Sequence, residues 1–131
     1  MILSYNFLNG QESKGSDIKV VIKNLENNKG KVYIALHDSE ATFLEDAIKG
    51  DTLKINNRSC EYTFKDVSPG VYAVSFYHDE NDNDKMDTNF MGIPKEDYGC
   101  SNNATGSFGP PKWEDAKFEV TTKDITQTIT L

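Results

Sequence analysis

The sequence predicts an all-β fold, a single antiparallel β-sandwich of about seven short strands with one long ordered loop. Two observations support this prediction. Apolar and polar side chains alternate with a period of two in several short segments, and Gly, Pro, Asn and Asp are concentrated in the links between them. At 131 residues the chain is long enough for one domain with its own core. Short alternating strands in a chain of this length are typical of a sandwich.

The strands are predicted as follows. The first is expected at 17–25, and the second, at 30–38, places Val32, Ile34 and Leu36 on one face. The segment 40–51 has apolar residues at helical spacing and predicts a helical turn. Further strands are expected at 52–56, 60–67, 70–79, 115–122 and 124–131.

The strand at 70–79 is nearly apolar on both faces, which indicates a central position in its sheet. The links at 26–30 and 122–124 are short, so the strands that they join are expected to form antiparallel hairpins.

The N-terminal residues 1–16 precede the predicted sandwich domain, 17–131. They are either the remnant of a secretory signal peptide or a polar leader, because the apolar run is short and no basic segment precedes it. We expect a periplasmic or secreted protein, with a cytoplasmic location as the alternative.

The charge balance excludes some partners. The formal net charge is −7, whereas nucleic-acid binding and docking on an anionic membrane both favour basic surfaces. No apolar run approaches the ~20 residues of a membrane span. The biological partner is otherwise unknown, and a protein or a carbohydrate is possible.

A long segment, 79–114, lacks a clear strand or helix pattern and begins with an acidic cluster. Between Asp79 and Asp87 the chain has five acids and one lysine, a local charge of −4. Loops longer than about 12–15 residues are uncommon unless a functional element orders them. A bound cation would explain both features.

The spacing of oxygen-bearing residues in this cluster predicts a calcium site. Calcium takes six to eight oxygen ligands, which a short loop supplies from alternate residues. A solvated acidic turn is the alternative, because Asp and Asn favour turns by themselves. The predicted ligands are Asp79, Asn81, Asn83, the carbonyl of Lys85, and Asp87.

The cluster departs from the familiar calcium loop at two positions. Asp84 stands where glycine is usual, although Asp tolerates the left-handed conformation. Phe90 replaces the bidentate Glu, so Asp87, Asn89 or Glu96 would have to supply the missing oxygens. The expected affinity is therefore modest and suits millimolar extracellular calcium.

The two cysteines, Cys60 and Cys100, are not part of a Cys-x-x-Cys motif. A disulfide between them would close a loop of about 40 residues and contribute roughly 4 kcal/mol. Two buried free thiols are the alternative.

The sequence contains no signature of a catalytic nucleophile, and we expect a non-enzymatic domain. A less favoured alternative is a metal-dependent enzyme in which His37 and His78, each at a strand end, lie side by side. A second alternative is a carbohydrate- or protein-binding module that uses exposed loop aromatics such as Tyr98 or Trp113.

The segment "HDENDNDKMDTNFMGIPKEDYGCSNN" and the later "FGPPKWEDAKF" resemble the bacterial domain-of-unknown-function family 2141. With the upstream strands, the resemblance covers roughly residues 17–131. The chain departs from the family pattern at Asp84, Asp97 and Trp113. The matching residues are His78, Asp79, Asn81, Asn83, Asp87, Asn89, Gly92, Pro94, Glu96, Gly99, Ser101, Asn102, Gly109, Pro110, Pro111, Asp115, Ala116 and Phe118.

This resemblance implies a prealbumin- or transthyretin-like β-sandwich that is usually exported. It implies no established activity and supplies no mechanism.

Overall fold

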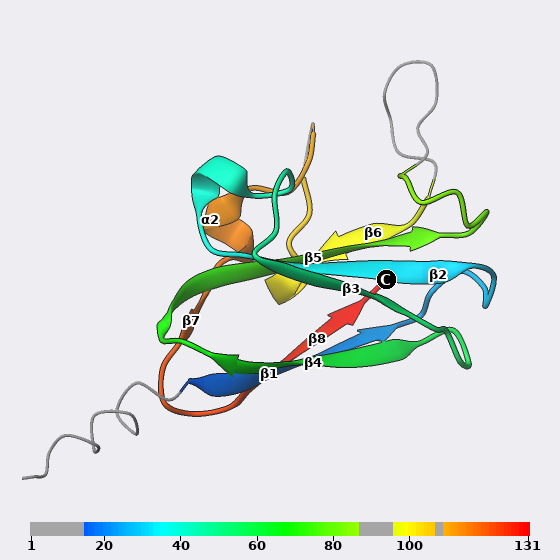
Figure 1. The fold of residues 1–131 in the computed structure, drawn as a ribbon. Coiled ribbons are helices and arrows are strands. Elements are labelled where there is room, and N and C mark those ends of the chain that lie inside the picture. Colours follow the sequence, from blue (N-terminus) through cyan, green and yellow to red (C-terminus); the bar gives the residue numbers. More distant parts are fainter. Residues whose placement is uncertain (1–14, 87–95, 107–108) are drawn as a thin grey trace, which may run out of the picture.

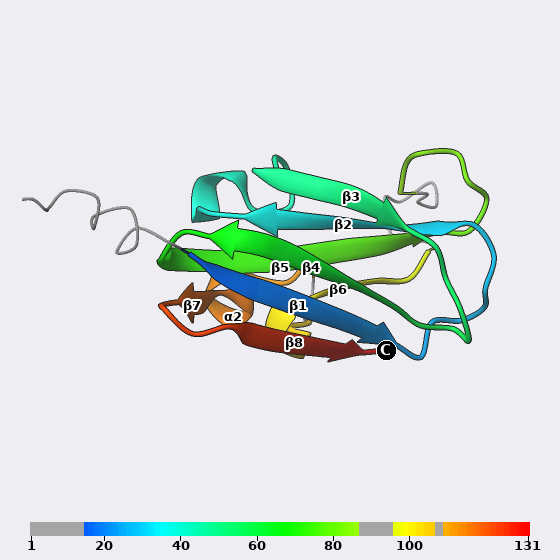
Figure 2. The ribbon, with the colours of Figure 1, turned by 60° about the horizontal axis from the view of Figure 1, so that its bottom comes forward.

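The computed structural model describes residues 15–86, 96–106 and 109–131, and it contains two β-sheets packed face to face (Figure 1). The three-stranded sheet has the order β4-β1-β8, with β4 at Cys60–Val67, β1 at Ser16–Lys23 and β8 at Ile125–Thr130 (Figure 2). The five-stranded sheet has the order β3-β2-β5-β6, and β7 also pairs with β5. Its strands are β2 (Lys31–His37), β3 (Lys49–Leu53), β5 (Gly70–Asp79), β6 (Tyr98–Cys100) and β7 (Phe118–Val120). The predicted all-β sandwich is confirmed.

The main core lies between the two sheets, where alternate residues of each strand point inward. The predicted inward face of β2, formed by Val32, Ile34 and Leu36, is confirmed, because each is at most 1% exposed. The facing sheet contributes Ile18, Val20 and Ile22 from β1, all fully buried. The predicted central position of β5 is also confirmed, since it pairs with β2 on one side and with β6 and β7 on the other.

The prediction of hairpins at the first and last links was wrong. β1 and β2 belong to different sheets, as do β7 and β8, so both links cross the sandwich. A link of a few residues can span the ~10 Å between packed sheets as readily as it can close a hairpin. β1 instead pairs antiparallel with β4 and parallel with β8, which the sequence analysis did not anticipate.

Three further segments differ from expectation. The strand expected at 52–56 lies earlier, as β3 at Lys49–Leu53. Its pairing with β2 already begins at Lys49, opposite Leu36. The long segment after β5 contains the short strand β6, a 3-10 turn η2 at Ser101–Asn103 and the helix α2 at Trp113–Ala116. The helical turn expected within 40–51 is present as a shorter 3-10 turn, η1, at Glu40–Thr42.

One end of the outer face of the five-stranded sheet is covered by η1, η2 and α2 (Figure 1). We call this cover the apolar cap. It forms a second hydrophobic cluster, separate from the main core. Its residues are Phe43, Ala73, Cys100, Ala104, Trp113 and Ala116.

The two cysteines are free thiols in different clusters. Cys60 packs against the main core, whereas Cys100 belongs to the apolar cap. Burial raises the pKa of the Cys60 thiol to about 11 and that of the Cys100 thiol to about 12. Of the two alternatives, the structure has free thiols: Cys100 is buried and Cys60 is half-buried. Within the described ranges, no helix has the length and apolarity required to cross a bilayer.

Candidate functional site

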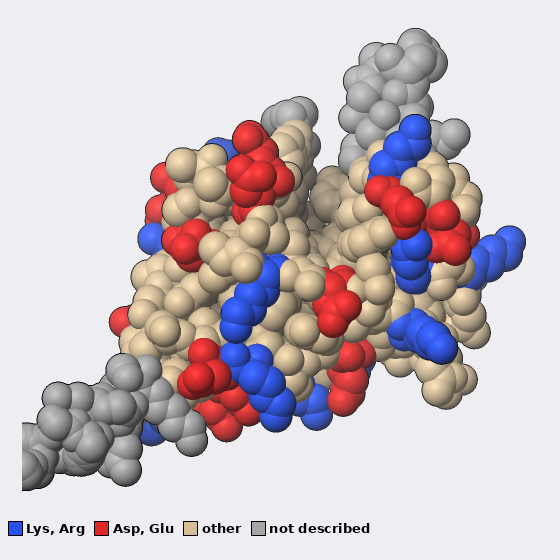
Figure 3. All heavy atoms as spheres, viewed as in Figure 1, with Lys and Arg blue, Asp and Glu red and all other residues tan. Residues whose placement is uncertain are grey.

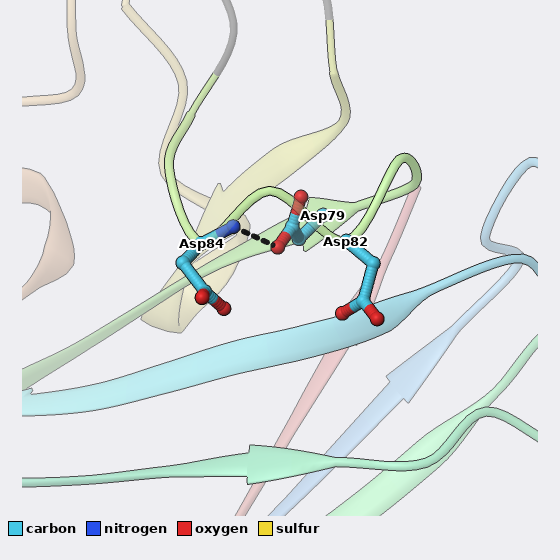
Figure 4. A group of neighbouring side chains, drawn as sticks. All are labelled: Asp79, Asp82 and Asp84. Atoms are coloured by element: carbon cyan, nitrogen blue, oxygen red, sulfur yellow. Dashed lines mark hydrogen bonds between the residues drawn. The ribbon is translucent and has the colours of Figure 1, made fainter.

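The acidic loop begins at Asp79, the last residue of β5, whose carboxylate organises the residues that follow. Asp79 is fully buried, and its Oδ1 accepts a hydrogen bond from the backbone N–H of Asn83 at 3.1 Å. Its Oδ2 accepts one from the N–H of Asp84 at 2.8 Å (Figure 4). A buried carboxylate that accepts two backbone N–H groups is a strong local constraint. The turn is therefore built around this side chain.

Two acids of the loop adopt the left-handed backbone conformation, Asp82 with φ of 56° and Asp84 with φ of 66°. Asp is one of the few residues other than glycine that enter this region readily. The expectation that Asp84 can replace the usual glycine is confirmed. A true glycine is needed at Gly30, with φ of +67°, because a Cβ there would lie 1.9 Å from the carbonyl oxygen of Asp79.

Three carboxylates converge in this loop. One oxygen from each of Asp79, Asp82 and Asp84 lies within 4.8 Å of the others, a grouping that can hold a metal ion. We call these residues the acidic triad. Its members differ in exposure, because the side chain of Asp79 is fully buried whereas those of Asp82 and Asp84 are 64% and 67% exposed.

The ammonium group of Lys31 lies among these carboxylates. Its Nζ is 2.5 Å from Oδ1 of Asp82, 2.6 Å from Oδ1 of Asp84 and 4.0 Å from Oδ2 of Asp79. Strand pairing places it there, since Lys31 of β2 is directly opposite Asp79 of β5. The triad therefore has a cation of its own, supplied by the chain.

The Lys31 contact changes the titration of its partners. Hydrogen bonds from Lys31 and then from the hydroxyl of Tyr33, at 2.6 Å, lower the pKa of Asp84. Hydrogen bonds to Asp82 and Asp84 raise the pKa of Lys31. Both shifts favour the charged forms at neutral pH, so the ion pairs form over a wide pH range.

The structure brings together only part of the predicted ligand set. Asp79 lies in the triad, while Oδ1 of Asn83 accepts the backbone N–H of Lys85 at 3.2 Å within the loop. Asn81 lies in the same turn, and Asp87 lies outside the described residues. The ligand roles of all five, including the Lys85 carbonyl, stay predictions.

Sequence reasoning missed Asp82 and Lys31. Asp82 is outside the alternate spacing on which the ligand prediction depended, and Lys31 is remote in sequence. Only the pairing of β2 with β5 shows that Lys31 faces the acidic loop. Glu96, considered as an additional ligand, is buried, and its Oε2 accepts the N–H of Glu80 at 2.9 Å. It is not a member of the triad.

The less favoured alternative, in which the two histidines lie side by side, does not match the structure. His78 is paired with Val32, near the start of β2. His37 is paired with Ala73. His37 is the last residue of β2 and His78 the second-last of β5, and because the strands are antiparallel, the histidines lie at opposite ends of the pair.

Each histidine has local hydrogen bonds. Nε2 of His78 contacts the carbonyl oxygen of Lys29 at 2.6 Å, so this nitrogen carries the hydrogen. Nδ1 of His37 donates to the carbonyl of Asp46 at 2.9 Å, and its Nε2 lies 2.8 Å from Oγ of Ser75. Burial lowers the pKa of His37, which keeps the ring neutral at pH 7. The Ser75 hydroxyl therefore donates to Nε2.

The Ser75–His37 contact has the donor order of a base-activated nucleophile, but its surroundings differ from those of a hydrolase site. Ser75 lies within β5 and is paired with Ala35 on one side and Cys100 on the other. The backbone N–H of Val74 beside it donates to Oγ of Ser101, and Ser75 itself pairs with both neighbouring strands, so this backbone is not directed at a developing oxyanion as acyl transfer requires.

The loop aromatics considered for binding differ in position. Trp113 packs edge-on against Phe43 in the apolar cap, with ring centroids 5.7 Å apart. Tyr98 is 37% exposed on β6, directly opposite Tyr77 of β5. Tyr77 in turn stacks on Tyr33, with centroids 5.1 Å apart and planes inclined by 24°. The available aromatic surface is therefore on the sheet rather than on Trp113.

The comparison with protein families identifies the family of this chain. The model of a family described as uncharacterised proteins conserved in bacteria (DUF2141) matches residues 20–128. The chain belongs to this family. The resemblance inferred from the acidic loop and the residues after it is confirmed. Comparisons with curated proteins and with solved structures give no match. The transthyretin-like description of the family fold stays a prediction.

Proposed function

We propose that this protein is an exported, non-enzymatic accessory or binding domain whose acidic loop is stabilised by calcium. The observation that supports it most is the acidic triad, which gathers three carboxylate oxygens within 4.8 Å at the end of a central strand. Carboxylates are the oxygen ligands that calcium prefers. Asp79, Asp82 and Asp84 would hold the ion, with other oxygens of the loop completing its shell.

The local charge favours a divalent cation. The triad and Lys31 sum to −2, because three carboxylates are opposed by one ammonium group. A calcium ion would supply two positive charges and bring this sum to zero. Lys31 would have to leave the space between Asp82 and Asp84 to admit the ion. Its long side chain is partly exposed and has room to turn away.

A weak calcium site would fit an exported protein. Two of the three carboxylates are largely exposed, and the calcium-loop position of the bidentate Glu is occupied by Phe90. Sites with few charged ligands and little rigidity fall in the range of about 10⁻⁴–10⁻³ M, which extracellular calcium fills. A non-enzymatic role is supported by the separation of His37 from His78. The second candidate, a carbohydrate- or protein-binding module, is supported by the exposed ring of Tyr98.

The test is a thermal melt of metal-free protein with calcium, magnesium or sodium chloride at equal ionic strength. We expect calcium to raise the melting temperature, because an ion that binds only the folded chain at 100 times its Kd contributes about 2.7 kcal/mol. Asp84→Asn should abolish the rise. Asp115→Asn is the matched control, since it removes one carboxylate from α2, away from the loop.

A substitution of Lys31 gives a second test, in which calcium binding should become stronger rather than weaker. Lys31→Met removes the competing cation, so calcium should bind more tightly than in the wild type. Lys19→Met is its control, because Lys19 pairs with Glu61 on the other sheet. An unchanged melting temperature in calcium for both the wild type and Lys31→Met would contradict the proposal and leave a solvated turn held by Lys31.

A further inference from the structure

Three tyrosines form a row across the outer face of the five-stranded sheet. Tyr33 of β2 is directly opposite Tyr77 of β5, and Tyr77 is directly opposite Tyr98 of β6. Directly paired residues project from the same face of a sheet. The three rings therefore stand together, and we call them the tyrosine row. It lies between the acidic triad and the rest of the outer face, since the Tyr33 hydroxyl reaches Asp84.

The next row of the sheet carries small residues, which leaves a hollow beside the rings. Ala35 is paired with Ser75 in this row, one step beyond the tyrosines. The opposite wall comes from the segment after η1 and includes Leu44, Glu45 and Ala47. The resulting pocket has a volume of about 360 Å³, enough for a small organic molecule. Figure 3 shows the recess between the two raised parts of this face.

The charge of the pocket is unfavourable for anions. Glu45 is the one charged residue among the described residues that line it, given that burial keeps His37 neutral. Neither Lys nor Arg lines the described part of the pocket. Beyond the tyrosine row, the triad and Lys31 add a net charge of −2. The field in the pocket therefore attracts cations.

Several polar groups of the pocket, on His37, Ser75 and Tyr33, are engaged within the protein, which makes it less suited to a sugar. Both ring nitrogens of His37 have partners, in Asp46 and Ser75. The Tyr33 hydroxyl donates to Asp84. A sugar requires several free donors and acceptors, whereas a cation requires aromatic faces and one carboxylate. Tyr33 already attracts a cation in this way, since Nζ of Lys31 lies 5.4 Å from its ring centroid.

We propose that this pocket binds a small organic cation, an alkylated ammonium group, through the tyrosine row and Glu45. The ammonium group lies against the ring faces with Glu45 as its counter-ion, and the apolar part of the cation contacts Leu44. This site is distinct from the calcium site in the acidic triad, and its occupancy does not require calcium. It gives the domain a ligand class that the family description does not specify.

The test is calorimetric titration with choline at constant ionic strength, compared with its neutral isostere 3,3-dimethylbutan-1-ol and with a methyl glycoside. We expect choline to bind about 2- to 30-fold more tightly than the isostere, the range that a cation–π contribution gives. Equal binding of the isostere would overturn the proposal in favour of an apolar pocket. Binding of the glycoside in preference to choline would overturn it in favour of a sugar.

Variants distinguish the two interactions. Glu45→Gln should weaken choline binding, and Glu114→Gln, on α2, is the matched control that should not. Tyr98→Leu should weaken binding, whereas Tyr98→Phe, which keeps the aromatic face and loses the hydroxyl, should retain it. Loss of binding in Tyr98→Phe would contradict the cation–π argument. Absence of choline binding at tens of millimolar would refute the proposal, whatever the result of the calcium melt.

Discussion

The two ends of the outer face of the five-stranded sheet are covered by different chemistry. At one end the apolar cap buries Ala73 and Ala116, and the hydroxyl of Ser101 bonds the cap to β5. At the other end the acidic loop is held by Lys31 and by the buried carboxylate of Asp79. The sheet is the same, so the difference lies in what stabilises each cover. The stability of the apolar cap should respond little to solvent conditions, whereas that of the acidic loop should respond to salt, pH and metal ions.

The apolar cap provides the largest expected effect. Ser101 is fully buried, its Oγ accepts the N–H of Val74 at 3.0 Å, and its hydroxyl donates to the carbonyl of Ala116 at 2.6 Å. Ser101→Ala leaves both backbone groups without a partner, so we expect a loss of about 3 kcal/mol in the free energy of unfolding. Urea denaturation measures it. The loss should be the same at low and high salt, and a salt-dependent loss would show that the cap is not the apolar end of the comparison.

Asp79→Asn tests the equivalent position at the acidic end. The substitution keeps the size of the side chain but turns one of its two acceptors into a donor, which then faces a backbone N–H of the loop. We expect a loss of about 2 kcal/mol in the free energy of unfolding. Hydrogen exchange of the Asn83 and Asp84 amides should accelerate, whereas that of Val74 should not. Unchanged exchange at Asn83 and Asp84 would show that Asp79 does not organise the turn.

The sequence predicted the sheet that both ends share better than it predicted how the acidic end is held. Alternation identified the inner face of β2, because a strand buried on one side must alternate, and the apolar character of both faces of β5 indicated its central position. Turn residues located the acidic loop, and the oxygen spacing identified Asp79. Strand pairing could not be predicted, because a short link serves a hairpin and a crossing between sheets equally well. For that reason Lys31, 48 positions before Asp79 in the sequence, was not expected in the site.

Lys31→Met in metal-free protein is expected to have a smaller effect. Lys31 pairs with Asp82 and Asp84, whose carboxylates are largely exposed, and exposed ion pairs contribute little because water screens them. The loss should be greatest at low salt and should disappear near 1 M salt, where the Debye length is about 3 Å. Urea midpoints at several salt concentrations measure it. Lys19→Met, which removes one exposed pair on the other sheet, shows how much of the loss is general.

The smallest expected effect is a pH dependence from Asp84. Its folded pKa is lowered, first by Lys31 and then by Tyr33, so its contribution to stability is present above the unfolded value of about 3.9 and is lost as the pH falls through the folded value. Lys31 has the opposite sign: its raised pKa gives stability below about 10.4 that is lost at more alkaline pH.

Urea midpoints of wild type and Asp84→Asn should therefore differ at pH 7 and converge as the pH approaches 2. Asp115→Asn, on α2, controls for the removal of one carboxylate. A difference that persists at pH 2 would mean that Asp84 acts through its left-handed backbone rather than through its charge. In that case the acidic loop would resemble the apolar cap in being held by local geometry, and the argument for a cation at the triad would lose its electrostatic basis.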